Sequence, residues 1–420
     1  VNREYFVRHL PLKALNVSDA KMLGQFRKLK DDICQIAKID CIVRLDDHSK
    51  GILLRPGIKS VADMSTPGQR LVAETGARMV DHDLEIGYEF WSMEEVLEQI
   101  LPPELHAEIP TGYTIVGHIA HLNVRDEYLP YKHVIGEIVL DKNPRIRTVV
   151  NKTDSIENQF RVFPMEVLAG EPDFLVDQSE SGCRFRFDFS KVYWNSRLHT
   201  EHDRIISQLR PHEAFCDVFA GVGPFAVPAA KKQVFTLAND LNPESYRYLV
   251  ENEQLNKVGE FLRCHNLDGR EFIRQSPRLL LEWRRIKGAV AVRTKTKPVK
   301  TTTVPVPQTI ARYSMNLPDS ALQFLDAFRG VFRDVPEYAP SNVEMPIIHV
   351  YCFYKYPPGE QEPESNRVQG DLTRIVNERL AHIFAPSDIE FRFVRKVAPA
   401  KDMYCLTFTL PESVAFEPRK

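Results

Sequence analysis

The chain has 420 residues, of which 43% are hydrophobic and 10% aromatic, enough for two or three folded domains with cores of their own. The formal net charge is −2, so overall charge gives no argument for nucleic-acid binding. No apolar run reaches the roughly 18 to 20 residues of a membrane helix. The 7 cysteines are scattered without CxxC pairs, which excludes a zinc ribbon and a disulfide framework and suits reduced intracellular thiols.

The first residues, VNREYFVRHL, lack the apolar region of a secretory signal. Because the sequence starts at Val1 rather than Met, the question whether a targeting segment precedes it stays open. We expect a cytoplasmic protein, with the mitochondrial matrix and the nucleus as further compartments. We also expect a monomer with no stable protein partner and no membrane contact.

Residues 1–105 are expected to form an N-terminal domain that is rich in helix. Apolar residues recur at helical spacing over 19–37, and a second helix is expected over 92–105, closed by Pro102 and Pro103. Residues 41–45 look like a strand.

Residues 106–192 have a mostly β pattern and are expected to form a mixed, β-rich domain. In its last strand three phenylalanines alternate with Arg184, Arg186 and Asp188, the period of a strand with one buried face. This pattern predicts an amphipathic strand with both arginines in solvent. A basic sheet face for RNA is the alternative.

Residues 193–420 alternate strands with helices, which predicts a doubly wound parallel sheet. Strands are expected at 214–220, 234–240, 261–268, 311–317 and 347–355, and helices at 224–232, 243–257, 319–332 and 366–384. The last strands, 389–397 and 403–410, have no helix between them and should pair antiparallel at one end of the sheet.

The stretch DVFAGVGPF, residues 217–225, places Asp217 at the end of the first of these strands, before Gly221 and Gly223. Glycines let a ligand approach the backbone closely. Neither a P-loop nor a dinucleotide fingerprint is complete here, because no Lys-Ser/Thr pair and no third glycine follow.

Acidic residues follow the next two strands as well. Asp240 can accept hydrogen bonds from both hydroxyls of a ribose, and Asp268, before Gly269, lies where an adenine amino group can bind. Three carboxylates would repel a pyrophosphate but not a cofactor with a ribose, an amino group and a sulfonium. The pattern therefore favours S-adenosylmethionine.

The fourth strand ends in Asn316, Leu317 and Pro318, where an amide or backbone carbonyl can face the methyl group and bind a planar base. A turn or helix cap beside Asp319 is the alternative role of Asn316.

The stretch NSRLHTEHDRI precedes the sheet, with Arg197 and Glu201 four residues apart. This spacing fits either a polar helix face turned towards the sheet or an ion pair on a surface helix. His199 and His202 lack a cysteine partner and the usual spacing of a metal pair, so we expect no metal.

Residues 284–300 hold 7 Lys or Arg and no acidic residue. A solvated, unstructured insertion explains this composition, and a tether for a phosphate backbone is the functional alternative. The insertion is expected to span about 277–308.

In this order, NSRLHTEHDRI, DVFAGVGPFAVPAAKK, ANDLNPESYRYL, NLDGREF and MNLPDSA resemble the eukaryotic tRNA (guanine-37-N1)-methyltransferase family over about 110–410. The resemblance implies an N-terminal domain that meets the tRNA elbow, an RNA-binding domain at 106–192 and a class I, Rossmann-like methyltransferase domain at 193–420, with a mostly parallel seven-stranded sheet. It implies a monomeric enzyme that methylates N1 of guanosine 37, next to the anticodon, and so supports maintenance of the reading frame.

Carried over by position, the resemblance implies a set of site residues. Its contacts to S-adenosylmethionine are His202, Asp217, Gly221, Gly223, Asp240, Leu241, Asp268, Gly269 and Asn316. Arg197 would address O6 of the guanine, Pro318 would hold the base edge, and either Asp240 or Glu201 would accept the N1 proton. The anticodon-loop base must flip out and stack on an aromatic ring, for which Tyr193, Trp194 and Tyr313 are candidates.

Three other functions stay open at this point. A wyosine-pathway aminocarboxypropyl transferase shares fold and cofactor, although Arg197 together with the NLP turn favours methyl transfer. A non-catalytic tRNA-binding protein could keep the fold as a scaffold. A small-molecule methyltransferase is disfavoured by the long segment upstream of residue 193.

Overall fold

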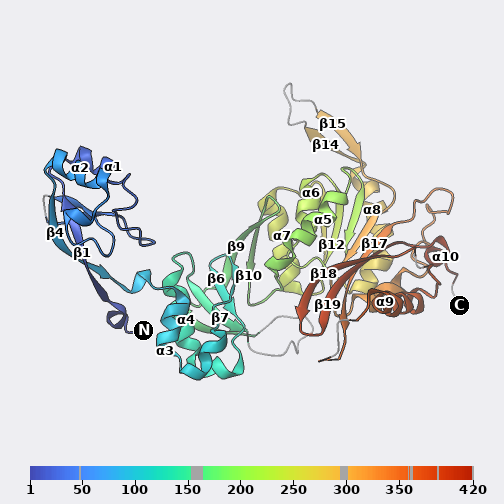
Figure 1. Ribbon diagram of the computed structural model, residues 1–420. Helices are drawn as coiled ribbons and strands as arrows, with labels where there is room; N and C mark the ends of the chain where they lie inside the picture. Colours follow the sequence, from blue (N-terminus) through green and yellow to red (C-terminus); the bar gives the residue numbers. More distant parts are fainter. Residues whose placement is uncertain are drawn as a thin grey trace. The chain divides into compact units, whose positions relative to one another are not determined.

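The computed structural model describes residues 1–46, 49–152, 164–293, 301–357, 359, 363–385 and 387–418 (Figure 1). The chain packs into two compact units. Unit 1 comprises 1–112, 124–145 and 168–170, and unit 2 comprises 113–123, 146–167 and 171–420. In the described ranges no helix is long and apolar enough to cross a membrane.

Unit 1 begins with a four-stranded antiparallel sheet in the order β2-β3-β1-β4. Its strands are β1 (Arg8–Asn16), β2 (Ile42–Arg44), β3 (Lys50–Leu53) and β4 (Arg78–Ile86). Its helices are η1 (Arg3–Phe6), η2 (Ala20–Met22), α1 (Leu23–Phe26), η3 (Val61–Asp63), α2 (Thr66–Thr75) and η4 (Tyr88–Phe90). The strand expected at 41–45 is confirmed as β2.

The long helix expected over 19–37 is wrong. Only η2 and α1 are helical there, and the chain then turns. Asp32 ties this turn to the start of α2, because its carboxylate accepts hydrogen bonds from the backbone N–H and hydroxyl of Ser65 at 2.7 and 2.6 Å. Ile33 bridges to Leu54 beside β3, so tertiary contacts outweigh the local periodicity.

The rest of unit 1 is mainly helical. It contains α3 (Met93–Ile100), η5 (Pro103–Glu108), η6 (Asp126–Tyr131) and α4 (Lys132–Lys142). α3 confirms the helix expected at 92–105, and Ser92 and Glu95 form its capping box. α4 interrupts the region that was expected to be mostly β, because an 11-residue helix with buried Ile135, Ile138 and Val139 forms there.

Two small sheets precede the large one in the sequence. β5 (Thr114–Val116), β6 (Ile119–Leu122), β7 (Thr148–Lys152) and β8 (Met165–Gly170) form one, and β9 (Leu175–Glu180) and β10 (Cys183–Asp188) form an antiparallel pair. On β10, Phe185 and Phe187 are buried while Arg184 and Arg186 are exposed, so the predicted amphipathic strand is confirmed.

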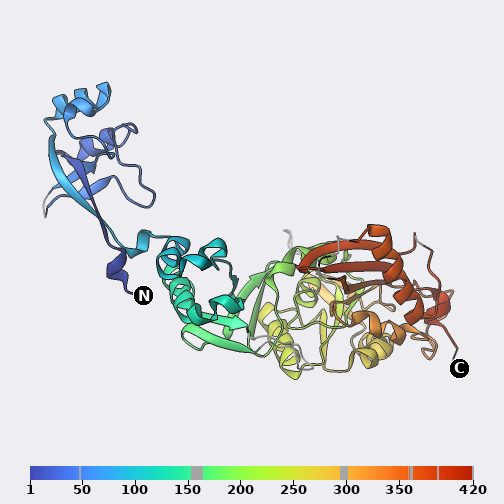
Figure 2. The same ribbon diagram turned by 60° about the horizontal axis from the view of Figure 1, so that its bottom comes forward.

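The described part of unit 2 is built on a seven-stranded sheet in the order β13-β12-β11-β16-β17-β19-β18. The strands are β11 (Ala214–Asp217), β12 (Phe235–Asn239), β13 (Leu262–His265), β16 (Arg312–Met315), β17 (Ile347–Lys355), β18 (Glu390–Ala398) and β19 (Lys401–Thr409). The first five in this order are parallel, and β19 and β18 pair antiparallel at the end, which confirms the predicted fold class. Figure 2 shows the C-terminal strands, in red, lying side by side.

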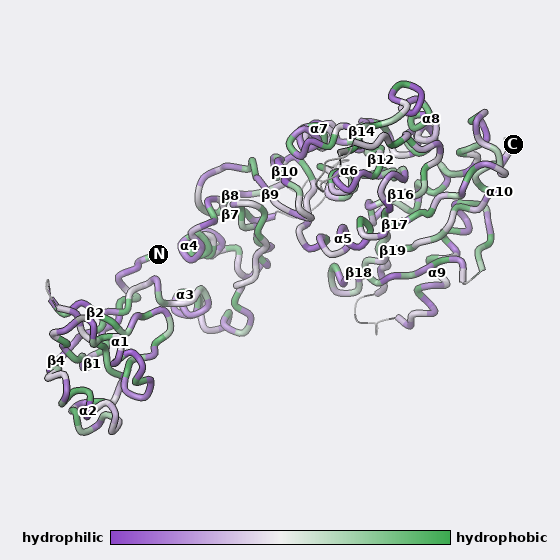
Figure 3. Tube along the Cα trace, turned by 90° about the horizontal axis from the view of Figure 1, so that it is seen from above, coloured by the Kyte–Doolittle hydropathy of each residue, from purple (hydrophilic) through white to green (hydrophobic). Residues whose placement is uncertain are grey.

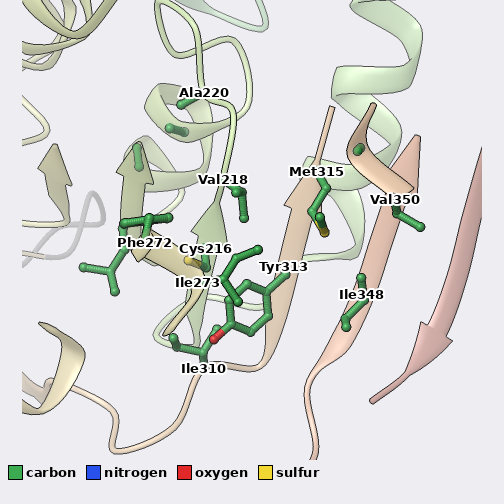
Figure 4. Close-up of a cluster of buried hydrophobic side chains, with 14 of the residues drawn as sticks. Cys216, Val218, Ala220, Phe272, Ile273, Ile310, Tyr313, Met315, Ile348 and Val350 are labelled. Atoms are coloured by element: carbon green, nitrogen blue, oxygen red, sulfur yellow. The ribbon is translucent and has the colours of Figure 1, made fainter. Parts of the chain in front are cut away.

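Helices cover both faces of this sheet. They are α5 (His199–Gln208), α6 (Ala226–Lys231), α7 (Pro243–Asn256), α8 (Gly269–Lys287), α9 (Ser365–Leu380) and α10 (Glu412–Ala415), with the 3₁₀ helices η7 (Ser196–Leu198) and η8 (Ala321–Phe328). The α-helix expected at 319–332 is the 3₁₀ helix η8 instead. Cys216, Tyr313 and Ile348 lie in the buried cluster between strands and helices (Figure 4).

The basic segment at 284–300 is structured over most of its described length. α8 continues through Pro277 to Lys287, and β14 (Ala289–Arg293) pairs with β15 (Thr301–Pro305). Val290 and Val304 are buried, so one side of this hairpin packs on the protein. The expectation of an unstructured insertion is therefore wrong for these residues, and its remaining part, 294–300, lies outside the described residues.

Candidate active site

The four chain segments that leave β11, β12, β13 and β16 lie at one edge of the sheet. In the parallel register Asp217 pairs with both Ala238 and Ser314, and Asn239 pairs with His265. The carboxyl ends of parallel strands meet at the same edge, which is where ligands of open α/β sheets bind. The segments carrying Asp217, Asp240, Asp268 and Asn316 therefore leave the sheet side by side.

The glycine turn after β11 has two glycines with different tasks. Gly221 and Gly223 have φ of +56° and +100°, values that other residues rarely adopt. A Cβ on Gly221 would meet only the carbonyl oxygen of Tyr193, at 4.0 Å, whereas a Cβ on Gly223 would lie 2.7 Å from Val227. Gly221 thus leaves an open approach for a ligand, and Gly223 permits packing of the turn on α6.

Asp240 is bound to this turn. Its carboxylate accepts hydrogen bonds from the backbone N–H of Gly221 at 2.8 Å and of Asn242 at 2.9 Å. Protein atoms surround the carboxylate, and this desolvation raises the pKa of Asp240 to about 6 despite the two hydrogen bonds. The next side chain, Leu241, is 39% exposed and offers an apolar surface beside the carboxylate.

Several buried acceptors at this edge have no hydrogen-bond partner in the described part of the chain: both carboxylate oxygens of Asp217, the Ser314 hydroxyl and Oδ1 of Asn316. Burial, followed by the nearby charge of Asp240, raises the pKa of Asp217 well above its usual range. Buried acceptors are almost always paired in folded proteins, and leaving one unpaired costs roughly 1–3 kcal/mol. Such acceptors suit a ligand that brings N–H and O–H donors.

Asp268 and Gly269 form the start of α8. The Asp268 carboxylate accepts hydrogen bonds from the backbone N–H of Arg270 and Glu271 at 2.9 and 3.3 Å, so it caps the helix. A Cβ on Gly269 would lie 2.8 Å from Phe219 and 3.1 Å from Phe324. Gly269 therefore lets α8 begin against the residues that follow β11.

Arg197 lies in η7, which Asn195 caps by accepting the Arg197 backbone N–H at 3.1 Å. The exposed Arg197 guanidinium donates to the Thr114 hydroxyl of β5 at 3.3 Å, and it pairs with no carboxylate among the described residues. The residues just before η7 contact the segments that leave the strands in two places. Asn242 donates its amide N–H to the Lys191 carbonyl at 2.9 Å, and the Tyr193 carbonyl faces Gly221.

The ion pair considered between Arg197 and Glu201 is not formed. Arg204 shares its Nε–H between the two carboxylate oxygens of Glu201, at 3.0 and 2.9 Å, and donates to one of them from Nη2 at 2.5 Å. The Tyr351 hydroxyl donates to the same carboxylate at 3.0 Å. These partners lower the pKa of Glu201 although burial opposes the shift, so the carboxylate is a poor proton acceptor. Glu201 holds α5 on the sheet and leaves the Arg197 guanidinium available.

His202 is buried as well, 4% exposed, although α5 is coloured hydrophilic over much of its length (Figure 3). Its Nδ1 lies 2.5 Å from the Glu180 carboxylate, and its ring contacts Phe225 edge to face at 4.6 Å. These contacts link α5 to β9 and α6. A cofactor contact from His202 stays a prediction.

The three candidate aromatic rings differ in burial. Trp194 stacks on Phe187 at 4.9 Å, and Tyr313 is fully buried and shares a hydrogen bond of 2.8 Å with Ser276. Both are core residues, so they are wrong as stacking partners for a flipped base. Tyr193 is 44% exposed and keeps that role open.

Sequence reasoning missed Thr114 and Asn242. Thr114 is separated from Arg197 by 83 residues, so no local motif connects them. Asn242 follows Asp240 in LNPE and could have been found as an N-cap before Pro243, since it accepts the Glu244 backbone N–H at 3.0 Å.

This sheet, with its glycine turn and acidic strand ends, defines a class I methyltransferase fold, the class that uses S-adenosylmethionine. A family model described as TRM5/TYW2 methyltransferase domain matches residues 177–287, and one described as TYW2 N-terminal domain matches 93–173. The tRNA (guanine(37)-N(1))-methyltransferases of Candida albicans and Schizosaccharomyces pombe are each 45% identical, covering 100% and 99% of this chain and 97% and 94% of their own length. The chain belongs to this family.

A solved complex of aTrm5 and tRNALeu shares the fold. It matches with a TM-score of 0.62 and 22% sequence identity, and the match covers 95% of this chain and 99% of that one.

Proposed function

We propose that this protein performs the reaction for which its family is named, methyl transfer to N1 of guanosine 37 in tRNA. The observation that carries the proposal is the pairing of two features: unpaired buried acceptors at the strand ends and the Arg197 guanidinium without a carboxylate partner among the described residues. The full-length similarity to enzymes of this name favours methyl transfer over aminocarboxypropyl transfer and over a non-catalytic scaffold.

S-adenosylmethionine supplies an electrophilic methyl group on a positive sulfur when it is bound. The residues present fit it: Asp217 and Asp240 offer carboxylate oxygens for an amino group and ribose hydroxyls, and Gly221 leaves the backbone open. Leu241 can pack against the adenine, beside the Asp268 cap. The negative charge of Asp240 also suits the sulfonium.

Guanine N1 carries a proton and is a weak nucleophile, so the proton must leave as the N–C bond forms. Negative charge then grows on O6. A guanidinium held near O6 stabilises this charge more in the transition state than in the ground state, which is the role we assign to Arg197. Its hydrogen bond to Thr114 limits the orientations of the side chain.

We assign proton acceptance to Asp240. With a pKa of about 6 it is ionised at neutral pH and yet basic enough to take a proton. The unpaired Oδ1 of Asn316 can accept a hydrogen bond from the guanine edge, and the Pro318 turn closes the site beside it. The Pro318 carbonyl accepts the Phe353 backbone N–H at 2.8 Å, which ties the turn to β17.

The other expectations stay predictions. Residues 1–105 would contact the tRNA elbow, the protein would act as a monomer, and it would work in the cytoplasm, the mitochondrial matrix or the nucleus.

The decisive experiment measures transfer of a labelled methyl group to a tRNA transcript with G at position 37 and to a matched transcript with A. We expect transfer to the first only, with large losses in Arg197→Ala and Asn316→Ala. Equal labelling of both transcripts, or transfer of the aminocarboxypropyl group instead, would refute the proposal.

A further inference from the structure

The C-terminal hairpin of β18 and β19 carries a bulge that re-aims one arginine. Phe393 pairs with Tyr404, and Arg395 pairs with Met403, so the register shifts by one residue between them. Directly paired residues in a sheet point to the same face. Without the shift Arg395 would share the face of Phe393, whereas the bulge turns it to the face of Met403.

The two faces have different neighbours. Met403 belongs to the buried cluster of Leu198 and Ile205, the residues of η7 and α5. The Phe393 ring contacts Tyr404 at 5.7 Å, and both line a cavity with residues of α9. The bulge therefore places Arg395 on the side of the sheet where η7 carries Arg197.

The strand register also places Arg395 level with the turn after β16. The Phe353 backbone N–H binds the Pro318 carbonyl, Phe353 pairs with Met403, and Met403 pairs with Arg395. β18 lies two strand spacings, roughly 10 Å, from β17 along this row. Arg395 thus lies beyond the carboxyl ends of the parallel strands, at the side of the candidate site.

The electrostatics of Arg395 agree with this placement. Burial, and then the positive charge of Arg197, lowers the pKa of Arg395, and the same two causes lower the pKa of Lys152 at the end of β7. The Arg395 Nε donates to the Lys396 carbonyl at 3.3 Å. Within the described ranges no carboxylate pairs with Arg395 or Arg197, so the repulsion between them is not offset by an acid.

We propose that Arg395 binds a backbone phosphate of the RNA next to the nucleotide that enters the site, while Arg197 faces the base. The inference rests on the proposed function and extends it to a second substrate contact. A guanidinium matches two phosphate oxygens with parallel N–H donors. A nucleotide that leaves the loop keeps its flanking phosphates, which bring negative charge to Arg197 and Arg395.

The test compares Arg395→Ala, Arg395→Gln and Arg395→Lys with Arg374→Ala as the matched control. Arg374 is an exposed arginine of α9 that pairs with Glu378 at 3.1 Å. The affinity of each variant for the G37 transcript is measured from about 50 to 200 mM salt. Single-turnover methyl transfer is measured in parallel.

We expect Arg395→Ala and Arg395→Gln to weaken binding about 10-fold at low salt and to reduce the salt slope by about one. Arg395→Lys should keep the salt slope and lose part of the affinity, because lysine keeps the positive charge but lacks the two parallel N–H donors of the guanidinium. The loss in kcat/KM should follow the loss in affinity, and Arg374→Ala should match the unaltered protein.

An unchanged slope and affinity in both neutral variants would overturn the proposal. A lower single-turnover rate at saturating tRNA with normal affinity would also overturn it, since Arg395 would then act on the reacting base. Melting temperatures identify a variant that is merely unstable, and Arg395→Gln then carries the test because it keeps most of the side chain. The unaltered protein tests the proposed function separately: if it does not methylate the G37 transcript, that function fails, whatever the salt slopes are.

Discussion

Replacement of Asp240 by Asn tests which of two carboxylates, Asp240 or Glu201, accepts the N1 proton. The variant keeps the size of the side chain and one acceptor oxygen for the Gly221 or Asn242 backbone N–H. It removes the basic group whose pKa burial raises to about 6. A positioned general base contributes typically 10²–10⁴-fold, so we expect a loss of that order in the single-turnover rate.

The pH dependence gives the prediction its sign. Only the ionised carboxylate can accept a proton, so the rate of the unaltered protein should rise through about pH 6 and level off above it. This acid limb should be missing in Asp240→Asn. Rates are measured at saturating S-adenosylmethionine and tRNA between about pH 5 and 9, because the same side chain is assigned to the ribose and its loss also weakens cofactor binding.

Glu201→Gln is the contrasting variant. Its carboxylate already binds Arg204 and Tyr351 and its pKa is lowered, so the chemical step should keep its acid limb. Breaking a buried ion pair costs about 3–5 kcal/mol at full burial, and urea unfolding should show a large part of this loss. An unchanged rate and acid limb in Asp240→Asn, or a folded Glu201→Gln without the acid limb, would refute the assignment.

Substitutions at three further residues test the site. Arg197→Ala should slow the chemical step about 10²–10³-fold in single-turnover assays, and Arg197→Lys should recover part of this loss; equal rates in all three proteins would exclude a charge contact to O6. Asp217→Asn should abolish the rise in melting temperature caused by S-adenosylmethionine but stabilise the free protein. A carboxyl group whose pKa is raised in the folded protein destabilises the fold as the pH rises above its unfolded pKa. The gain in stability over the unaltered protein should therefore be larger at pH 8 than at pH 5, and a smaller gain at pH 8 would contradict this reasoning. Gly269→Ala should lower the free energy of urea unfolding by about 1–3 kcal/mol and weaken cofactor binding, because its Cβ would lie 2.8 Å from Phe219 and 3.1 Å from Phe324. An unchanged free energy of unfolding would show that these rings move at no cost.

The sequence alone predicted the sheet architecture of residues 193–420 and the order of the segments that leave its carboxyl edge. Alternating strands and helices set the parallel sheet, and the lack of a helix before residues 403–410 set the antiparallel end. Asp217, Asp240 and Asn316 could be placed together because the ends of parallel strands meet at one edge. These features depend on local periodicity and on turn residues, which a sequence states directly.

Only the tertiary structure decided which side chains are free of other contacts and can reach a substrate. Trp194 and Tyr313 have the chemistry of stacking residues but fill the core, and Glu201 takes Arg204 and Tyr351 as partners rather than Arg197. The segment 19–37 has helical spacing, yet it turns where its side chains meet residues far away in the chain.

Arg395 shows the same limit most clearly. Its face depends on a one-residue shift between two strands, and such a shift follows from packing on both sides of the sheet. Residues nearly 200 positions apart share no periodic signal in the sequence, so the fold decided that Arg395 and Arg197 lie on the same side of the sheet.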